Sequence, residues 1–591
     1  MSVCRFSFDS FTMSNGLRVV VHKDESLPLA HVVSWYGVGT RDEGPGEREM
    51  AHLYEHMMFS SLEGVDDIHR LLLSAGADPS SGAADAGVSE DSTTYFTTVP
   101  KSSLETVLWL EAARMCQPMG DNCEEEFKTQ LGVVKNEIFT RYRQDPFGRR
   151  NELIREGMFP SNHPYGNRTI GDRTDLSHIT LSGLRAFGER YYHPANCVLV
   201  VAGDVHLDDV KLQVEKHFGP IPASAQMVRS GLWPCHLSSD CMTVVRGPLP
   251  IEQVFINWPS THWMSEDEAA YWVLSDLLTA SPDSLLAKKL INQGFALEAR
   301  ACQSSSDLAG TFGLFAVLRP GGNAEQIKTS CQFVLEKLAS DGPERDLLSA
   351  SKARIEFCWS RQMEPIGGGG RRAYEAAHCA SVLNDPHKLN ETFSAYREVE
   401  AEDIKRVATQ LLESACFTLH FEKSSQMGCP KTKITTRPPI PEPQKQFPTF
   451  TPELPRKKTI DNGMQTVSVK RPSSPTLHVG LYVNVGSAAD PRGKEGLSSL
   501  AAELLSQRSR ILEGIGATVV PDFSPFLSGA IVSTTKEHLA KVLNTLAKTI
   551  TDSKGEEEDF EAIKGRALAQ LQRVSNNMIA ASEFFFPAVL Y

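Results

Sequence analysis

The sequence lacks the features that mark three broad classes of protein. Its 591 residues include 12 cysteines, but none form a C-x-x-C pair and none follow Cys429. A disulfide framework or a cysteine-based zinc site needs denser or clustered cysteines, so we expect reduced thiols. The chain has 60 basic against 73 acidic residues, and a net charge of −13 argues against nucleic acid as a partner. No apolar run reaches the roughly 18 residues of a membrane span.

The beginning of the chain, MSVCRFSFDSFTMSNG, also lacks a charged segment followed by an apolar one. That pair of segments is the mark of a secretory signal peptide. Together with the missing membrane span, its absence predicts a protein that is cytoplasmic or otherwise soluble.

Instead, the sequence contains alternating strand and helix patterns. Apolar and polar residues alternate over 17–42, which predicts two strands joined by a turn at 24–27. Further along, the patterns predict three helices and two strands: helices at 46–59, 104–115 and 124–143, and strands at 92–100 and 196–205. This order predicts an α+β fold, with repeated modules in which helices pack on one face of a mainly antiparallel sheet.

The chain also repeats itself at long range. Asn15-Gly16 and Gly39 recur as Asn462-Gly463 and Gly486, about 447 residues later, within a longer stretch of similar patterning. We therefore predict four segments. They are a first module at 1–222, a second module of the same fold at 223–422, a linker with eight prolines at 423–456, and a partial copy of the first module at 457–591.

The segment EREMAHLYEHMMFSS carries the most specific chemical pattern. His52 and His56 are four residues apart, so on a helix their imidazoles project from one face and can share a metal ion. Glu55 lies beside them. Two helical histidines cannot complete a zinc site, so a third ligand must come from elsewhere in the chain. Taken alone, the pattern also fits a polar helix face with two solvated histidines.

The surrounding segments favour the metal site over a polar helix face with solvated histidines. GTRDEGPGEREMAHLYEHMMF resembles the active-site helix of the pitrilysin/insulysin-like zinc metallopeptidases, the inverzincins with H-x-x-E-H, which include the mitochondrial processing peptidases. Four further segments resemble that family's motifs in the family's order: DSTTYFTTVP, EFKTQLGVVKNEI, RYYHPANCVLVVAGDV and FGPIPA. The resemblance implies that His52, His56 and Glu137 bind one zinc ion and that Glu55 is the general base. It also implies a peptide or unfolded polypeptide as substrate.

Two positions depart from the family's pattern. Gln130 stands seven residues before the expected third ligand, where the family usually has a glutamate that supports the site. The family's substrate-binding edge strand usually reads N-A-x-T, whereas Asp85 and Ala86 begin the sequence DAGV here. We expect these three residues to lie in the second shell or to contact substrate.

The partial copy has lost the chemical residues. Ser499, Ala502 and Glu503 stand where the first module has His52, Glu55 and His56, and Gln570 stands where it has Glu137. This fits the family arrangement of an active half closed against an inactive half. By that resemblance, the chain stops before a fourth domain.

The expected function is therefore a zinc metalloendopeptidase acting on short or unfolded polypeptides. The alternative is a catalytically impaired, truncated homologue or subunit that binds peptide and needs a partner half, with a homodimer as one possible arrangement. A respiratory-complex core subunit of the same fold fits less well, because such subunits generally lose the zinc ligands that this chain keeps.

Overall fold

The fold is described from a computed structural model of the chain. It covers residues 5–564, with gaps at 60–61, 63–64, 66, 117–122, 141–145, 167–175, 226, 228–230, 248, 282–283, 424–453, 471–473, 475, 495, 509–511, 513–515, 525, 552–559 and 561–562. Contacts divide the chain into two compact units, residues 1–348 with 362–473 and residues 349–361 with 474–591. The predicted linker falls almost wholly outside the described residues, and Gln570 falls wholly outside them.

The first unit opens with a six-stranded sheet in the order β1-β2-β6-β3-β5-β4. Its strands are β1 (Asp9–Thr12), β2 (Arg18–Lys23), β3 (Leu29–Tyr36), β4 (Ala84–Val88), β5 (Thr93–Pro100) and β6 (Cys197–Gly203). Most neighbours are antiparallel, whereas β2 and β6 pair in parallel. The mixed, mainly antiparallel sheet confirms the predicted α+β class.

The strands predicted around the turn at 24–27 exist as β2 and β3, but they do not pair with each other. β6 lies between them, parallel to β2 and antiparallel to β3. Its sequence CVLVVAG is buried throughout, as suits a strand covered on both faces. Local alternation shows where strands lie, but it cannot show that a strand from much later in the chain will insert between two of them.

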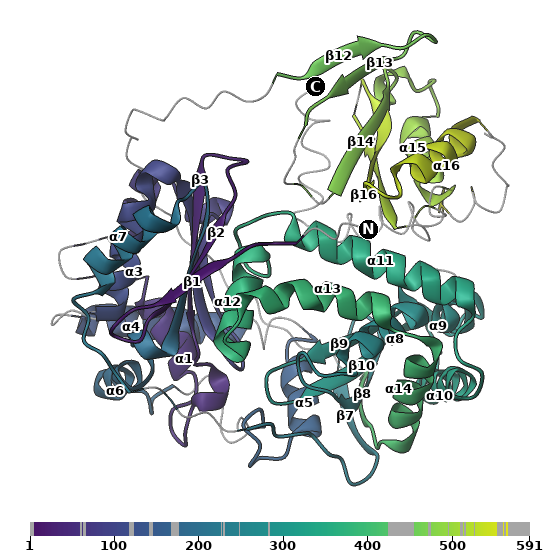
Figure 1. The fold of residues 1–591 in the computed structure, drawn as a ribbon. Coiled ribbons are helices and arrows are strands. Elements are labelled where there is room, and N and C mark those ends of the chain that lie inside the picture. Colours follow the sequence, from purple (N-terminus) through teal and green to yellow (C-terminus); the bar gives the residue numbers. More distant parts are fainter. Residues whose placement is uncertain are drawn as a thin grey trace. The chain divides into compact units, whose positions relative to one another are not determined.

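Helices of the first module pack on one face of this sheet, as predicted, and α12 (Arg372–Leu383) of the predicted second module covers the other face. Ala30, Val32 and Tyr36 of β3 join the large core formed with the module's own helices. Trp35 points the other way and meets Tyr374 of α12, with ring centroids 4.9 Å apart. Figure 1 shows α3 (Leu104–Cys116) and α7 (Leu207–Phe218) on the opposite side of the sheet from α12.

Of the other helices, α1 (Met50–Met57) and α4 (Glu124–Phe139) carry residues of the predicted site, and α6 (Leu181–Tyr191) packs against α1. α1 is shorter than the predicted 46–59. Its first turn starts only after Glu49, whose backbone is left-handed with a φ of 66°. That conformation is incompatible with continuing the helix toward the N-terminus.

The second sheet has five strands in the order β7-β11-β8-β10-β9. These are β7 (Cys241–Gly247), β8 (Gln253–Ser260), β9 (Ala296–Ser305), β10 (Gly310–Leu318) and β11 (Phe417–Lys423). Helices α8 (Glu268–Thr279), α10 (Ala324–Asp341) and α14 (Ala401–Glu413) pack together and α8 contacts β9. The turn between β9 and β10 matters for the site, because it contributes to a pocket described below.

The second unit contains a three-stranded sheet, β14-β16-β15, with helices α15 (Leu497–Arg508) and α16 (Leu539–Thr551). The strands are β14 (Thr476–Val483), β15 (Ala517–Phe523) and β16 (Ser528–Thr535). This order repeats β3-β5-β4 of the first sheet. β14 corresponds to β3 and α15 to α1, and both pairs are separated by the same number of residues. The separation between β5 and its counterpart β16 is smaller. The repeated sequence therefore folds into repeated elements, with a shorter connection in the later copy.

Candidate metal centre

The helix α1 separates an apolar side from a polar one. Met50, Leu53, Tyr54 and Met57 are buried in the core, spaced as one face of a helix requires. His52, Glu55 and His56 occupy the remaining side, with side chains 14 to 21% exposed. Core packing therefore fixes the rotation of α1 and turns its polar side outward from the core.

The third predicted ligand comes from a different helix. α4 buries Phe127, Val134 and Ile138 and contacts α1. Glu137, next to Ile138, lies at the edge of this buried side with its side chain 33% exposed. Packing of α4 against α1 thus brings Glu137 to the two histidines, although the two helices are far apart in the sequence.

The three ligand atoms form a nearly equilateral triangle. His52 Nε2 and His56 Nε2 are 3.2 Å apart, and Glu137 Oε2 lies 3.5 and 3.4 Å from them. Zinc–ligand bonds of about 2.0–2.1 Å in a tetrahedron place ligand atoms roughly 3.3 Å apart. The triangle therefore has the size and the N, N, O chemistry of a three-ligand zinc site with a fourth position open. It is the one such group among the described residues.

A second carboxylate holds His52 from behind. Glu49 Oε2 lies 3.2 Å from His52 Nδ1, the ring nitrogen that faces away from the triangle. A carboxylate on that nitrogen fixes the tautomer and the ring orientation of a metal-binding histidine. The left-handed backbone of Glu49 places this side chain, so the turn that starts α1 also orients the His52 ring.

Charge and burial shift the pKa values of this cluster. Burial lowers the pKa of His52, but hydrogen bonds to Glu137 and Glu49 outweigh it and raise the value to about 10. Burial raises the pKa of Glu55, although His56 and His52 oppose this effect. Glu55 Oε2 lies 4.0 Å from His56 Nε2, close to the triangle without belonging to it.

The other predicted residues occupy different places. Asp85 and Ala86 lie in β4, which ends the first sheet and contacts α1, and both line the cavity at the histidines. Gln130 donates a 2.9 Å hydrogen bond to Glu126 one turn earlier in α4. It does not line that cavity, so the structure brings Asp85 and Ala86 to the candidate site and keeps Gln130 apart from it.

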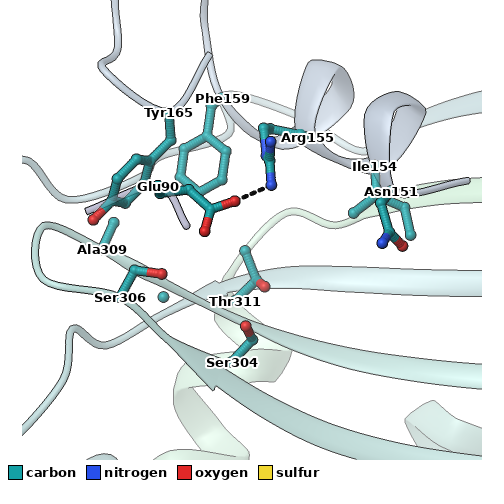
Figure 2. A pocket seen from close by; sticks show the side chains of 11 residues that line it. Glu90, Asn151, Ile154, Arg155, Phe159, Tyr165, Ser304, Ser306, Ala309 and Thr311 are labelled. Carbon is teal, nitrogen blue, oxygen red and sulfur yellow. Dashed lines mark hydrogen bonds and ion pairs between the residues drawn. The ribbon is translucent and has the colours of Figure 1, made fainter. Parts of the chain in front are cut away.

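The cavity has a volume of about 760 Å³. Besides the triangle, Glu55 and β4, its walls include residues that follow α4 and lie in or near α5 (Arg150–Met158). A second pocket of about 260 Å³ adjoins it, and Glu90, Asn151 and Arg155 line both. Figure 2 shows Glu90 pointing toward Arg155, with which it forms an ion pair.

Sequence reasoning missed Glu49 and the wall residues. Glu49 had a usable signal, because it precedes His52 by three positions and so shares its side of the helix turn. Glu90, Asn151 and Arg155 had none. They come from separate segments that only the packing of the chain brings together.

Comparison with known proteins identifies the family to which the chain belongs. Residues 18–146 match the model of the insulinase family (peptidase family M16), and residues 178–355 match that of the peptidase M16 inactive domain. An uncharacterized zinc protease of Mycobacterium leprae is 31% identical over 423 residues, which cover 68% of this chain and 88% of the relative. The chain therefore belongs to peptidase family M16, as the sequence motifs indicated.

Two solved structures show the same fold. A protease from Helicobacter pylori matches with a TM-score of 0.63 and 23% identity, over 71% of this chain and all of the other. Pitrilysin matches with a TM-score of 0.64 and 14% identity, over 96% of this chain and 65% of pitrilysin. The pitrilysin match reaches into the repeated part of the chain as well as the first unit.

The repeated copy keeps the helix without the ligands. α15 begins at the position equivalent to α1, and Ser499 and Glu503 replace the two histidines there. Among the residues described for this copy, no group of three metal-binding side chains occurs.

No helix among the described residues is long and apolar enough to cross a bilayer.

Proposed function

We propose that this chain is a zinc-dependent metalloendopeptidase that hydrolyses peptide bonds in short or unfolded polypeptides. The observation that carries the proposal is the triangle of His52, His56 and Glu137, with Glu55 beside it and an open strand edge alongside. The names of relatives such as the M. leprae zinc protease support zinc as the metal.

His52, His56 and Glu137 would hold the ion, and Glu49 would keep His52 in the tautomer that presents Nε2. A zinc ion held there would polarise the scissile carbonyl and make water a better nucleophile near neutral pH. The remaining chemistry belongs to the side chains of the protein.

Glu55 is placed to act as the general base. It takes a proton from the attacking water and then delivers it to the nitrogen of the leaving amine. Burial raises the pKa of Glu55, which makes its carboxylate a stronger base than an exposed glutamate. Its position one residue before His56 keeps it within reach of the same water.

The sheet edge in the cavity wall supports the proposed substrate class. Among the described residues β4 has a partner strand on one side alone, so its other edge can pair with an added strand. Only an extended segment can pair with it, and a folded protein offers few such segments. Short or unfolded polypeptides are therefore the natural substrates, with Asp85 and Ala86 beside the bound backbone.

The test combines zinc content with cleavage of a quenched, unstructured peptide. The unmodified chain should hold one zinc per chain and cleave. Glu55→Gln should keep the zinc and lose cleavage by about 10²–10⁴-fold, because only the proton transfer is removed. Glu137→Gln should lose the zinc as well.

Glu503→Gln is the matched control, since Glu503 lies in α15 at the position equivalent to His56. It should leave both zinc and cleavage unchanged. A chain that holds zinc and never cleaves would instead support the impaired homologue or subunit that needs a partner half. A chain without zinc would refute the ligand assignment.

A further inference from the structure

The pocket beside the catalytic cavity has no role in the proposed chemistry. We infer that it is a subsite for an uncharged, hydrogen-bonding side chain of the substrate, such as glutamine or asparagine. We further infer that the Glu90–Arg155 ion pair keeps it selective against charged side chains. This inference rests on the proposed function, because it assumes a peptide in the catalytic cavity.

The pocket adjoins the catalytic cavity. Glu90, Asn151 and Arg155 form a wall common to both. Glu90 lies just beyond the end of β4, so a peptide paired with β4 runs toward it. An extended chain covers about 13 Å between the positions of Ala86 and Glu90 at its usual rise. The side chain that enters the pocket is therefore several residues from the bond that is cut.

The far wall is built by the second sheet. Ser304 of β9 and Thr311 of β10 are direct cross-strand partners, and Ser306 follows in the turn. Within the described part of the chain, the hydroxyl groups of these three residues are not engaged in hydrogen bonds. Figure 2 shows Thr311 and Ser304 on the adjacent strands beside the ion pair. A ligand entering here meets several groups that can donate as well as accept.

The turn that carries this wall is held in place before any ligand binds. The Asp307 backbone N–H donates to Asp91 Oδ2 over 3.0 Å, and the Tyr165 hydroxyl donates to Asp91 Oδ1 over 2.8 Å. The Leu308 N–H donates to the Tyr165 oxygen over 2.9 Å. Arg41, just before α1, pairs with Asp91. The wall is thus fixed to the module that carries the zinc ligands, so little ordering is needed on binding.

The charge balance of the pocket decides the ligand class. Glu90 and Arg155 are the two charged residues that line it, and they are paired with each other. An arginine or lysine would have to displace Arg155 from Glu90, and an aspartate or glutamate would have to displace Glu90 from Arg155. An amide side chain leaves the pair intact and can bond to the hydroxyls and to the Asn151 amide. The pocket volume of about 260 Å³ has room for a side chain of this size.

The experiment removes one charge at a time. An unstructured host peptide is made with Gln, Arg, Glu or Leu at each of the five positions on either side of the cleaved bond. The unmodified chain should prefer Gln at one position. Arg155→Gln leaves Glu90 uncompensated and should shift that position toward Arg by at least about fivefold, whereas Glu90→Gln should shift it toward Glu. The double variant Glu90→Arg with Arg155→Glu should restore the original preference.

Lys328→Gln is the control, since it breaks the ion pair between Lys328 of α10 and Asp240, which precedes β7, and should change no preference. Binding of the same peptides to the zinc-loaded Glu55→Gln protein, read by fluorescence anisotropy, should follow the same order without cleavage. A chain that binds selectively but does not cleave would refute the proposed function alone. A chain that cleaves with no opposite shifts in the two variants, or that prefers a charged residue before substitution, would overturn the subsite.

Discussion

Gly188 of α6 tests whether the packing behind the zinc helix controls the metal site. A Cβ at this position would lie 2.4 Å from the ring and hydroxyl of Tyr54, which is 1% exposed and belongs to α1. Tyr54 cannot move aside freely, because its ring stacks on Tyr192 with centroids 4.0 Å apart. Gly188→Ala therefore forces α1 or α6 to shift.

Two opposing energies set the expected size of this effect. Overpacking a buried site typically costs about 1–3 kcal/mol, and a contact this short belongs at the upper end. Replacing glycine by alanine inside a helix stabilises the helix by about 0.8–1 kcal/mol. We expect Gly188→Ala to lower the free energy of unfolding by about 2 kcal/mol and to weaken zinc binding, because α1 presents two of the proposed ligands.

Gly132→Ala provides the matched control. Gly132 lies in α4, the helix that carries Glu137, and a Cβ there would meet nothing within 4 Å. This variant should gain up to about 1 kcal/mol and keep its zinc affinity. Urea unfolding and zinc competition with a chelator measure both quantities. If Gly188→Ala behaves like Gly132→Ala in both assays, the argument that packing behind α1 positions the ligands is refuted.

Two further predictions concern buried ionisable side chains where α12 and the segment before it meet the first sheet. Burial lowers the pKa of His31 to about 4, so the unfolded chain takes up this proton first as the pH falls. The stability that neutral His31 contributes is complete above pH 6.5 and is lost toward pH 4, by at most about 3 kcal/mol. His31→Asn, which can keep the hydrogen bond to Thr98, should flatten the loss measured by urea unfolding between these pH values; an unchanged slope would contradict the assignment. Arg372→Met should lower the free energy of unfolding by about 3–5 kcal/mol, because it leaves the buried Asp24 carboxylate without its charged partner. Arg406 forms an exposed ion pair with Asp267, so Arg406→Met should lower it by about 1 kcal/mol or less in the same assay. Equal losses in the two arginine variants would show that burial of the Arg372–Asp24 pair does not matter.

Much of the candidate site could be predicted because its signals are local or belong to a known motif. His52, Glu55 and His56 lie within one helical turn and a half, and the resemblance to family M16 supplied Glu137. The structure then placed all four side chains together. The same helical spacing could have predicted the contact of Glu49 with His52, but it could not have predicted the left-handed backbone of Glu49.

The remaining features depend on contacts between distant segments. Nothing near 17–42 indicates that β6 separates β2 from β3, because strand patterns carry no information about partners. The pocket at Glu90 and Arg155 likewise combines a turn after β4, helix α5 and the β9–β10 hairpin. Such sites follow from topology, which local periodicity does not determine.

The position of β6 also has a consequence for the order of folding. Trp35 of β3 pairs with Val198, so the centre of the first sheet closes a long loop that contains every helix from α1 to α6. Contacts of such long sequence separation form slowly, since the loss of chain entropy precedes the gain from pairing. During synthesis, His52 and His56 emerge long before the strand that completes the sheet beneath their helix. Zinc capture in a native geometry should therefore be a late event, and a nascent chain that stops before Cys197 should bind zinc only weakly.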